Sequence, residues 1–196
     1  MRQFLLGGLV GGILLFVWGA VSWTVLPFSI SSLHRVSGED ALLGAMKASM
    51  GAKGVYYLPA MPPRSGVPAN DEQMQKQYNE KLKAGPTALV VFNPRGSEPL
   101  RADQMIYGLI DDFLCALIGV WFLMRSTAYA SGYIARAAFF GMFGVLVSFF
   151  VHLTNYNWFD YPADYTVAMT LDAVLAWIVS GLGVAAVVKE RTAKAA

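Results

Sequence analysis

Residues 137–172 read AAFFGMFGVLVSFFVHLTNYNWFDYPADYTVAMTLD, two apolar segments joined by an aromatic link at Asn155–Pro162. Small side chains recur at helical spacing on one face of each segment, and small residues allow helices to approach closely. His152 shares the face of the first segment and Asp172 that of the second. Ionisable groups inside a bilayer are costly and need partners, so both are candidate functional residues. The small residues predicted at helix contacts are Ala137, Gly141, Gly144, Ser148, Ala168, Ala176, Ser180 and Gly183.

The composition is that of a membrane protein. Of 196 residues, 56% are hydrophobic and only 14% are charged, whereas about 25% charged residues is usual in soluble domains. About 20 apolar residues in a helix cover the roughly 30 Å hydrocarbon layer of a bilayer. We therefore predict an α-helical integral membrane protein with four transmembrane helices, at residues 4–26, 105–124, 134–153 and 167–188.

The first apolar run is predicted to pack closely against other helices. Its small residues at contact spacing are Gly8, Gly12, Gly19 and Ser22. A charged start and small residues near its end also resemble a signal peptide. Because the run continues to Phe28, we expect an uncleaved anchor.

The region between the first two apolar runs differs in composition, with most of the charge and only short apolar runs. We divide the chain into helix 1 (1–28), a small α/β extracytoplasmic domain (29–104), and helices 2–4 with a short tail (105–196). Within the small domain we predict a capping box at 37–40 before a helix at 41–46, a strand at 54–60, a loop at 61–70, a helix at 71–84 and a strand at 87–92.

Positive charge in the short loops predicts the orientation. Arg2, the link at 125–136 and the tail with Lys189, Arg191 and Lys194 fall on one side of a four-pass chain. The link at 155–165 has no lysine or arginine. Cytoplasmic loops carry the excess of Lys and Arg, whereas long domains are exported regardless of charge. We expect a multi-pass protein of the cell inner membrane with both termini cytoplasmic and the 29–104 domain periplasmic or extracellular.

Three ionisable residues are predicted to meet inside the membrane. Asp112 shares a helical face with Gly108 and Gly119. Counting 1.5 Å per residue, Asp112, His152 and Asp172 lie within about 7 to 14 Å of the outer surface. Such a cluster could be a proton relay or ion site, or bind a polar head group, or be a hydrogen-bonded lock between helices. His152 could also ligate a haem or chlorophyll-type pigment.

The sequence shows no sign of common catalytic or nucleic-acid-binding sites. It contains no phosphate loop, HExxH, CxxC or nucleophile motif, and the net charge of +2 is slight. The single cysteine, Cys115, excludes an internal disulfide. We expect no catalytic residues, no metal site and no nucleic-acid partner, and we assign no cofactor.

Several short motifs carry a resemblance to a known group of proteins. Residues 22–27 (SWTVLP), 54–59 (GVYYLP), Gly85-Pro86 and 93–96 (NPRG) together resemble a family of uncharacterised bacterial inner-membrane proteins. The resemblance implies the same four-pass layout over most of the chain, and it implies no activity.

The expected function is that of a non-catalytic accessory or structural subunit in a larger membrane assembly, such as a respiratory or photosynthetic complex. Its partners would be the lipid bilayer and the other subunits. The alternative is a small transporter or proton-coupled protein that uses Asp112, His152 and Asp172. A third class is a membrane enzyme acting on lipid at the outer face.

Overall fold

The computed structural model describes residues 1–62 and 72–189 and divides the chain into two compact units. The helical unit combines residues 1–35 with the chain from Leu100 onward, and the small unit is Val36–Pro99. Residues 29–35 and 100–104, which the sequence assigned to the small domain, lie in the helical unit. The tail residues Arg191 and Lys194 and most of the predicted 61–70 loop lie outside the described residues.

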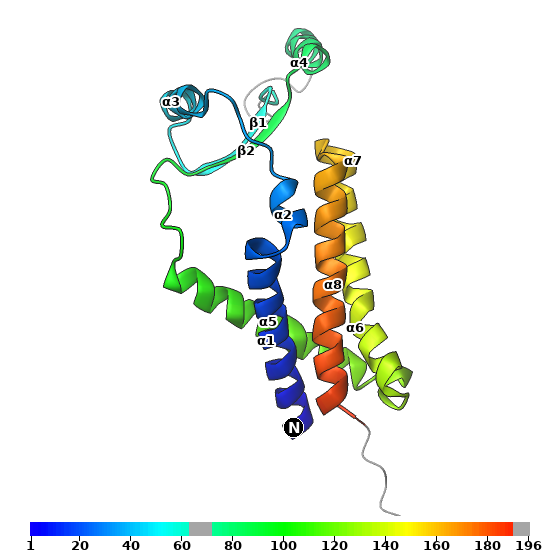
Figure 1. The fold of residues 1–196 in the computed structure, drawn as a ribbon. Helices are drawn as coiled ribbons and strands as arrows, with labels where there is room; N and C mark the ends of the chain where they lie inside the picture. The colour runs from blue at the N-terminus through cyan, green and yellow to red at the C-terminus, as the bar shows by residue number, and fades with distance from the viewer. Residues whose placement is uncertain (63–71, 190–196) are drawn as a thin grey trace, which may run out of the picture. The chain divides into compact units, whose positions relative to one another are not determined.

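Four helices of the helical unit are long and apolar enough to cross a membrane. Their positions confirm the four predicted runs to within a few residues at most ends (Figure 1). The helices are α1 (Arg2–Thr24), α5 (Ala102–Leu123), a continuous helix over Tyr133–Phe159, and α8 (Ala163–Val187). A short helix, α2 (Pro27–Ser31), follows α1. Pro27 occupies its first position, where a backbone N–H would have no partner within the helix.

The third long helix differs from its prediction. It consists of α6 (Tyr133–Val147), a π-helical segment η2 (Ser148–Leu153) and α7 (Thr154–Phe159). The predicted aromatic link is therefore mostly helical, and the connection to α8 consists only of residues 160–162. Asp160 adopts a left-handed conformation (φ 51°) there, which a short polar side chain tolerates. The aromatic residues and asparagines of 154–159 therefore continue the helix beyond its predicted end, and most of their side chains are exposed.

Glycines bring the long helices into backbone contact. A Cβ on Gly144 of α6 would lie 2.7 Å from the Ala173 carbonyl oxygen of α8, and one on Gly12 of α1 would lie 2.6 Å from the Cα of Phe113 in α5. Helix α8 packs against α1 and against α6, while α5 packs chiefly along α1 and is inclined to it in Figure 1. At one end of the bundle the core consists of Val120, Leu123, Phe140, Val184 and Val188.

The small residues predicted at helix contacts differ in how closely they approach a neighbouring helix. Close approaches occur at Gly8, Gly12, Gly119, Gly141, Gly144 and Gly183, and Ser148 and Ser180 are buried. Ala176 is partly buried, and Gly108 meets Phe16 only at an ordinary 3.7 Å. The prediction was wrong for Gly19, because no atom lies within 4 Å of the position its Cβ would take. Helical spacing alone does not show where neighbouring helices diverge.

The small unit contains a two-stranded antiparallel sheet and two helices. Strand β1 (Gly54–Leu58) pairs with β2 (Ala88–Phe92), with Gly54 opposite Phe92. The helices are α3 (Glu39–Ser49) and α4 (Glu72–Ala84), and neither has a fully buried residue. All four elements occur where the sequence predicted them. The capping box is absent, because the N-cap of α3 is Gly38 in a left-handed conformation without a side-chain cap.

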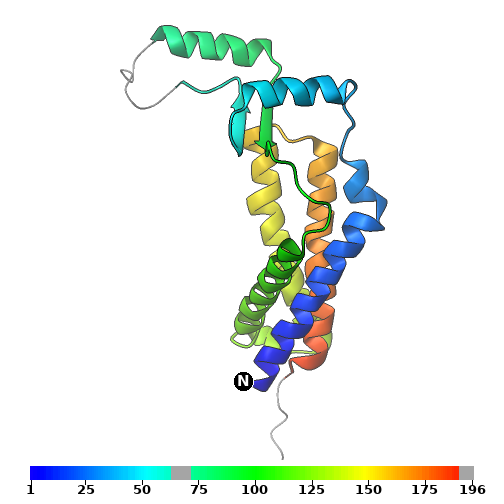
Figure 2. The same ribbon diagram turned by 90° about the vertical axis from the view of Figure 1, so that its left-hand side faces the viewer.

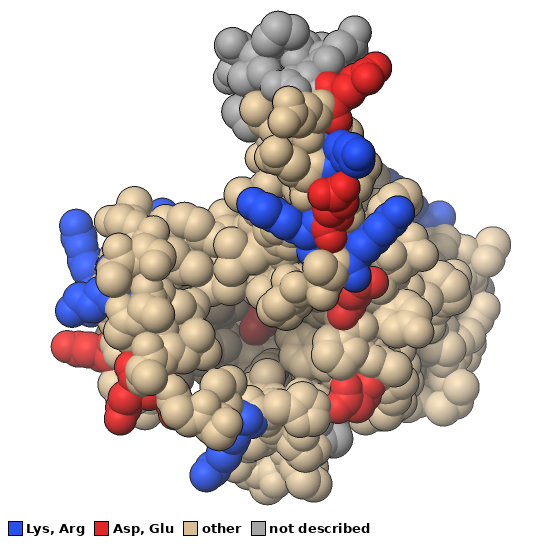
Figure 3. Space-filling model, turned by 90° about the horizontal axis from the view of Figure 1, so that it is seen from above, with Lys and Arg blue, Asp and Glu red and all other residues tan. Residues whose placement is uncertain are grey.

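The two units can be followed in a second view (Figure 2). Most of the surface seen in Figure 3 is neither basic nor acidic, in keeping with the low charged fraction of the chain.

Candidate functional site

Asp172 is held by two side chains of α1. The indole Nε1 of Trp18 donates to Asp172 Oδ1 at 2.7 Å, and the hydroxyl of Ser22 donates to the same oxygen at 2.6 Å. Trp18 and Ser22 are four residues apart and therefore lie on one face of α1. The Ser22 side chain is completely buried. The carboxylate thus has the polar partners that a group in apolar surroundings requires.

The role of Trp18 was not predicted. From the sequence, Ser22 was expected only as a small contact residue. The usable signal was their i, i+4 spacing, which places an N–H and an O–H donor on one face near the end of an otherwise apolar helix.

His152 lies in the π-helical segment η2 and is half-buried. It is within electrostatic range of Asp172, although the described residues show no hydrogen bond to its ring. One turn earlier, the hydroxyl of Ser148 donates to the Gly144 carbonyl at 2.7 Å and lies 3.4 Å from the carbonyl of Thr170 in α8. The Oγ1 of Thr170 is buried and has no hydrogen-bond partner in the described part of the chain. Single π-helical turns occur frequently at functional sites.

Asp112 is separate from this arrangement in its contacts. It is half-buried on α5, beside the close approach of Gly12 to the α5 backbone. Within residues 1–62 and 72–189, it makes no hydrogen bond or ion pair and none of the described contacts joins it to His152 or Asp172. Of the three predicted residues, only His152 and Asp172 are within electrostatic range of each other among the described contacts. The complete cluster stays a prediction.

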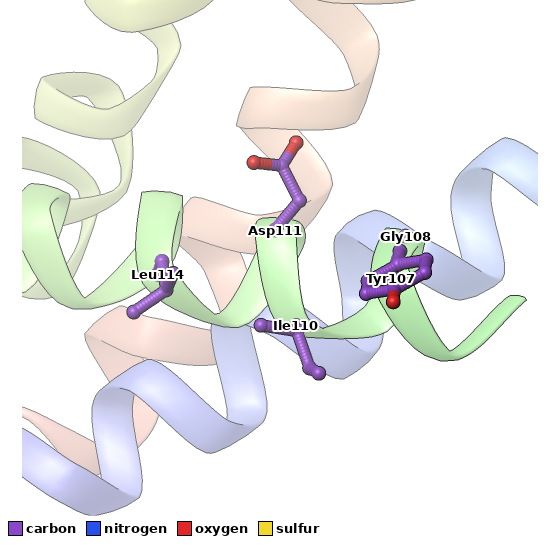
Figure 4. Close-up of a pocket in the computed structure, with 5 residues that line it drawn as sticks. All are labelled: Tyr107, Gly108, Ile110, Asp111 and Leu114. Carbon is purple, nitrogen blue, oxygen red and sulfur yellow. The ribbon is translucent and has the colours of Figure 1, made fainter. Parts of the chain in front are cut away.

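The adjacent carboxylate, Asp111, is exposed on the same helix, α5. It lines a shallow depression together with Tyr107, Gly108, Ile110 and Leu114 (Figure 4). All five residues belong to α5, and the Asp111 side chain points away from the helix axis in Figure 4. We call the exposed residues Tyr107, Ile110, Asp111, Leu114 and Ile118, which share one side of α5, the open face.

The end of the bundle that holds the N-terminus has its own polar contacts. The hydroxyl of Tyr129 lies 3.2 Å from Gln3 Oε1 and 3.1 Å from the carbonyl of Lys189. The buried Arg136 donates to the carbonyls of Ser131 and of Ala185 near the end of α8. A cation near the C-terminal end of a helix is favourable, since unpaired carbonyls make that end partly negative.

The second histidine of the chain has a separate partner. His34 Nε2 lies 3.0 Å from Asp164 Oδ2 in the first turn of α8, and both side chains are exposed. His34 belongs to the helical unit, although the sequence placed it in the small domain. Among the described residues, no group of three or more His, Cys, Asp or Glu side chains could hold a metal ion.

Fold and site together define a protein with four candidate membrane-spanning helices, a polar clamp between α1 and α8, and an exposed carboxylate on α5. No protein-family model, curated protein or solved structure matches the chain. The resemblance to bacterial inner-membrane proteins therefore stays an expectation.

Proposed function

We propose that this protein is a non-catalytic accessory or structural subunit of a larger membrane assembly. The proposed setting is a bacterial inner membrane and an energy-converting complex, respiratory or photosynthetic. The observation that supports the proposal is the open face of α5, where an exposed carboxylate lies within an otherwise apolar surface.

Lipid tails alone would leave the Asp111 carboxylate on this face without a polar partner. Tyr107 is 70% exposed and Ile118 is 56% exposed, and lipid tails solvate such side chains well. Asp111 differs from them because an ionisable group inside a bilayer almost always faces other protein or a water-filled cavity. A neighbouring subunit on this side of α5 would supply that environment.

Two other ionisable residues of the long helices already have hydrogen-bond partners. Asp172 is bonded to Trp18 and Ser22, and Arg136 to two carbonyls. Asp111 and Asp112 are two spanning-helix carboxylates for which the described residues provide neither a hydrogen bond nor an ion pair. This contrast favours assembly through α5 over a role confined to the interior of the bundle.

The proposed orientation places both termini in the cytoplasm. Tyr129 brings the 125–136 link close to Gln3 and Lys189, so the basic Arg2, Arg125 and Lys189 cluster at one end of the bundle. The positive-inside rule then assigns that end to the cytoplasm and the small unit to the periplasm or the exterior.

Extraction of the full chain from its native membrane in mild detergent tests the proposal. The particle mass and the visible absorption spectrum are recorded together. A particle much larger than a few copies of the 21.3 kDa chain is the expected result, and absorption bands in it would indicate a pigment- or haem-containing complex. Recovery as a lone monomer across several mild detergents would overturn the proposal.

A second candidate function is supported by the surroundings of His152. The π-helical segment carries His152, and the facing helix α8 carries Asp172 and Thr170, whose hydroxyl has no hydrogen-bond partner among the described residues. Together they would suit a small transporter or a proton-coupled protein, because intramembrane His and Asp residues form proton relays.

Reconstitution into liposomes with an internal pH dye tests this second function. It predicts a proton flux under an imposed gradient that disappears in His152→Phe. Proteoliposomes of Trp23→Phe, altered at an exposed residue of α1, are the matched control. Flux that is equal in empty and protein-containing liposomes would exclude the second candidate.

A further inference from the structure

We propose that the open face of α5 docks a transmembrane helix of a different protein, which carries an arginine or lysine at the depth of Asp111. This inference rests on the proposed function and names the chemistry of the neighbouring subunit. Three features support it: the shape of the open face, the position of Asp111 along α5, and the Lys and Arg side chains present in the long helices of this chain.

The shape of the face suits a helix. Tyr107, Ile110, Leu114 and Ile118 recur at three- and four-residue spacing and are 48% to 70% exposed. The absence of a side chain at Gly108 leaves the shallow depression beside Tyr107 (Figure 4). An apolar helix fits such a surface through anchors spaced three, four and seven residues apart.

The position of Asp111 selects the charge of the partner. Asp111 is nine residues after Ala102, so it lies about 14 Å along the helix from the first residue. A carboxylate there is satisfied by a cation or a strong donor on a neighbouring helix, and a basic side chain does both.

A second copy of this chain does not supply that group. Within the described spanning helices, the Lys and Arg side chains are Arg2 at the beginning of α1 and the buried Arg136 in α6. Arg136 already donates to Ser131 and Ala185. A symmetric pair of α5 helices would instead place two Asp111 carboxylates near each other. The occupant is therefore a different chain.

Energy transfer between the full chain and a synthetic helix in liposomes tests this proposal. The probe is a single-span Leu/Ala peptide of about 22 residues, enough to cross the bilayer, with one central Arg and an acceptor dye. Matched peptides carry Leu or Glu at the same position. The protein carries a donor dye on Ser131→Cys in a Cys115→Ala background.

The Arg peptide is expected to associate, and the Leu and Glu peptides to associate on the order of tenfold more weakly, as for loss of an interhelical polar contact. The variant Asp111→Leu should lose the preference for Arg. Asp111→Asn is nearly the same size and, since Asp111 is exposed, tests the charge without changing the packing. Asp112→Asn removes the neighbouring carboxylate and should keep the preference.

Three results would overturn the proposal: equal association of the Arg and Leu peptides, an unchanged preference in Asp111→Leu, or self-association of the protein through α5. The outcomes also separate the two proposals. A lone monomer in native membranes with a preserved Arg preference would overturn only the accessory-subunit function. A large native assembly without an Arg preference would overturn only the chemistry assigned to α5.

Discussion

Trp18 and Asp172 are 154 residues apart in the sequence and are joined by a 2.7 Å hydrogen bond between helices α1 and α8. Ser22 donates to the same carboxylate oxygen at 2.6 Å. Two donors on successive turns of α1 fix both the rotation of that helix and its position along α8. Asp172 is therefore a structural clamp in this bundle, and its partners Trp18 and Ser22 are not the residues with which the sequence grouped it.

Removing the indole donor should weaken the bundle. Trp18→Phe keeps an aromatic ring and removes the N–H, so we expect the free energy of unfolding in detergent to fall by about 1 kcal/mol, the usual size of an interhelical hydrogen bond. Thermal or denaturant unfolding followed by circular dichroism measures the change. Trp23→Phe, on an exposed part of the same helix, should have a much smaller effect. Equal losses in the two variants would contradict the clamp.

His152→Phe should destabilise the protein less than Trp18→Phe does. A hydrogen-bonded lock that included His152 would lose clear stability on this replacement. In the structure, the described residues give the His152 ring no hydrogen bond, and its relation to Asp172 is electrostatic. The same unfolding experiment compares the two variants. A larger loss in His152→Phe would restore the view that His152 is a central member of the polar cluster.

The four candidate membrane-spanning helices were predictable because about 20 consecutive apolar residues are the length that a bilayer requires. The extent of the third helix was not, because residues 155–159 contain polar and aromatic side chains that usually mark a helix end at the membrane surface. Polar and aromatic side chains are tolerated within a helix as well as at its end, so their presence alone does not fix where the helix stops.

The candidate site was predictable only in part. The unusual ionisable residues are visible in the sequence, since acidic and histidine side chains are rare in apolar runs. Their partners are not, because the Trp18 to Asp172 contact depends on how α1 is rotated against α8. Asp111 and Asp112 show the same limitation. The helical period separates their directions by about 100°, but the period alone does not show that the side of α5 with Asp111 is exposed.

Chemical labelling should place the two ends of the bundle on opposite sides of the membrane. In a Cys115→Ala background, we expect Asp160→Cys to react with a membrane-impermeant maleimide in spheroplasts. Ser131→Cys should react only after permeabilisation, because it lies with Arg136 at the basic end. Mass-tag shifts on gels measure both reactions. The reverse pattern would place both termini outside and would contradict the proposed orientation.

Two glycine replacements should have opposite consequences. In Gly144→Ala, the new methyl group would lie 2.7 Å from the Ala173 carbonyl oxygen and from the Cα of Val174, and backbone atoms of α8 cannot move aside cheaply. We expect a loss of about 1 to 3 kcal/mol, as for overpacked cores. Gly19→Ala meets no atom within 4 Å and gains helix propensity, so stability should be unchanged or slightly higher. Unfolding of both variants in the same detergent measures the contrast. A neutral Gly144→Ala would show that α6 and α8 are farther apart than this packing requires, whereas a damaging Gly19→Ala would place a neighbouring chain or helix against that part of α1.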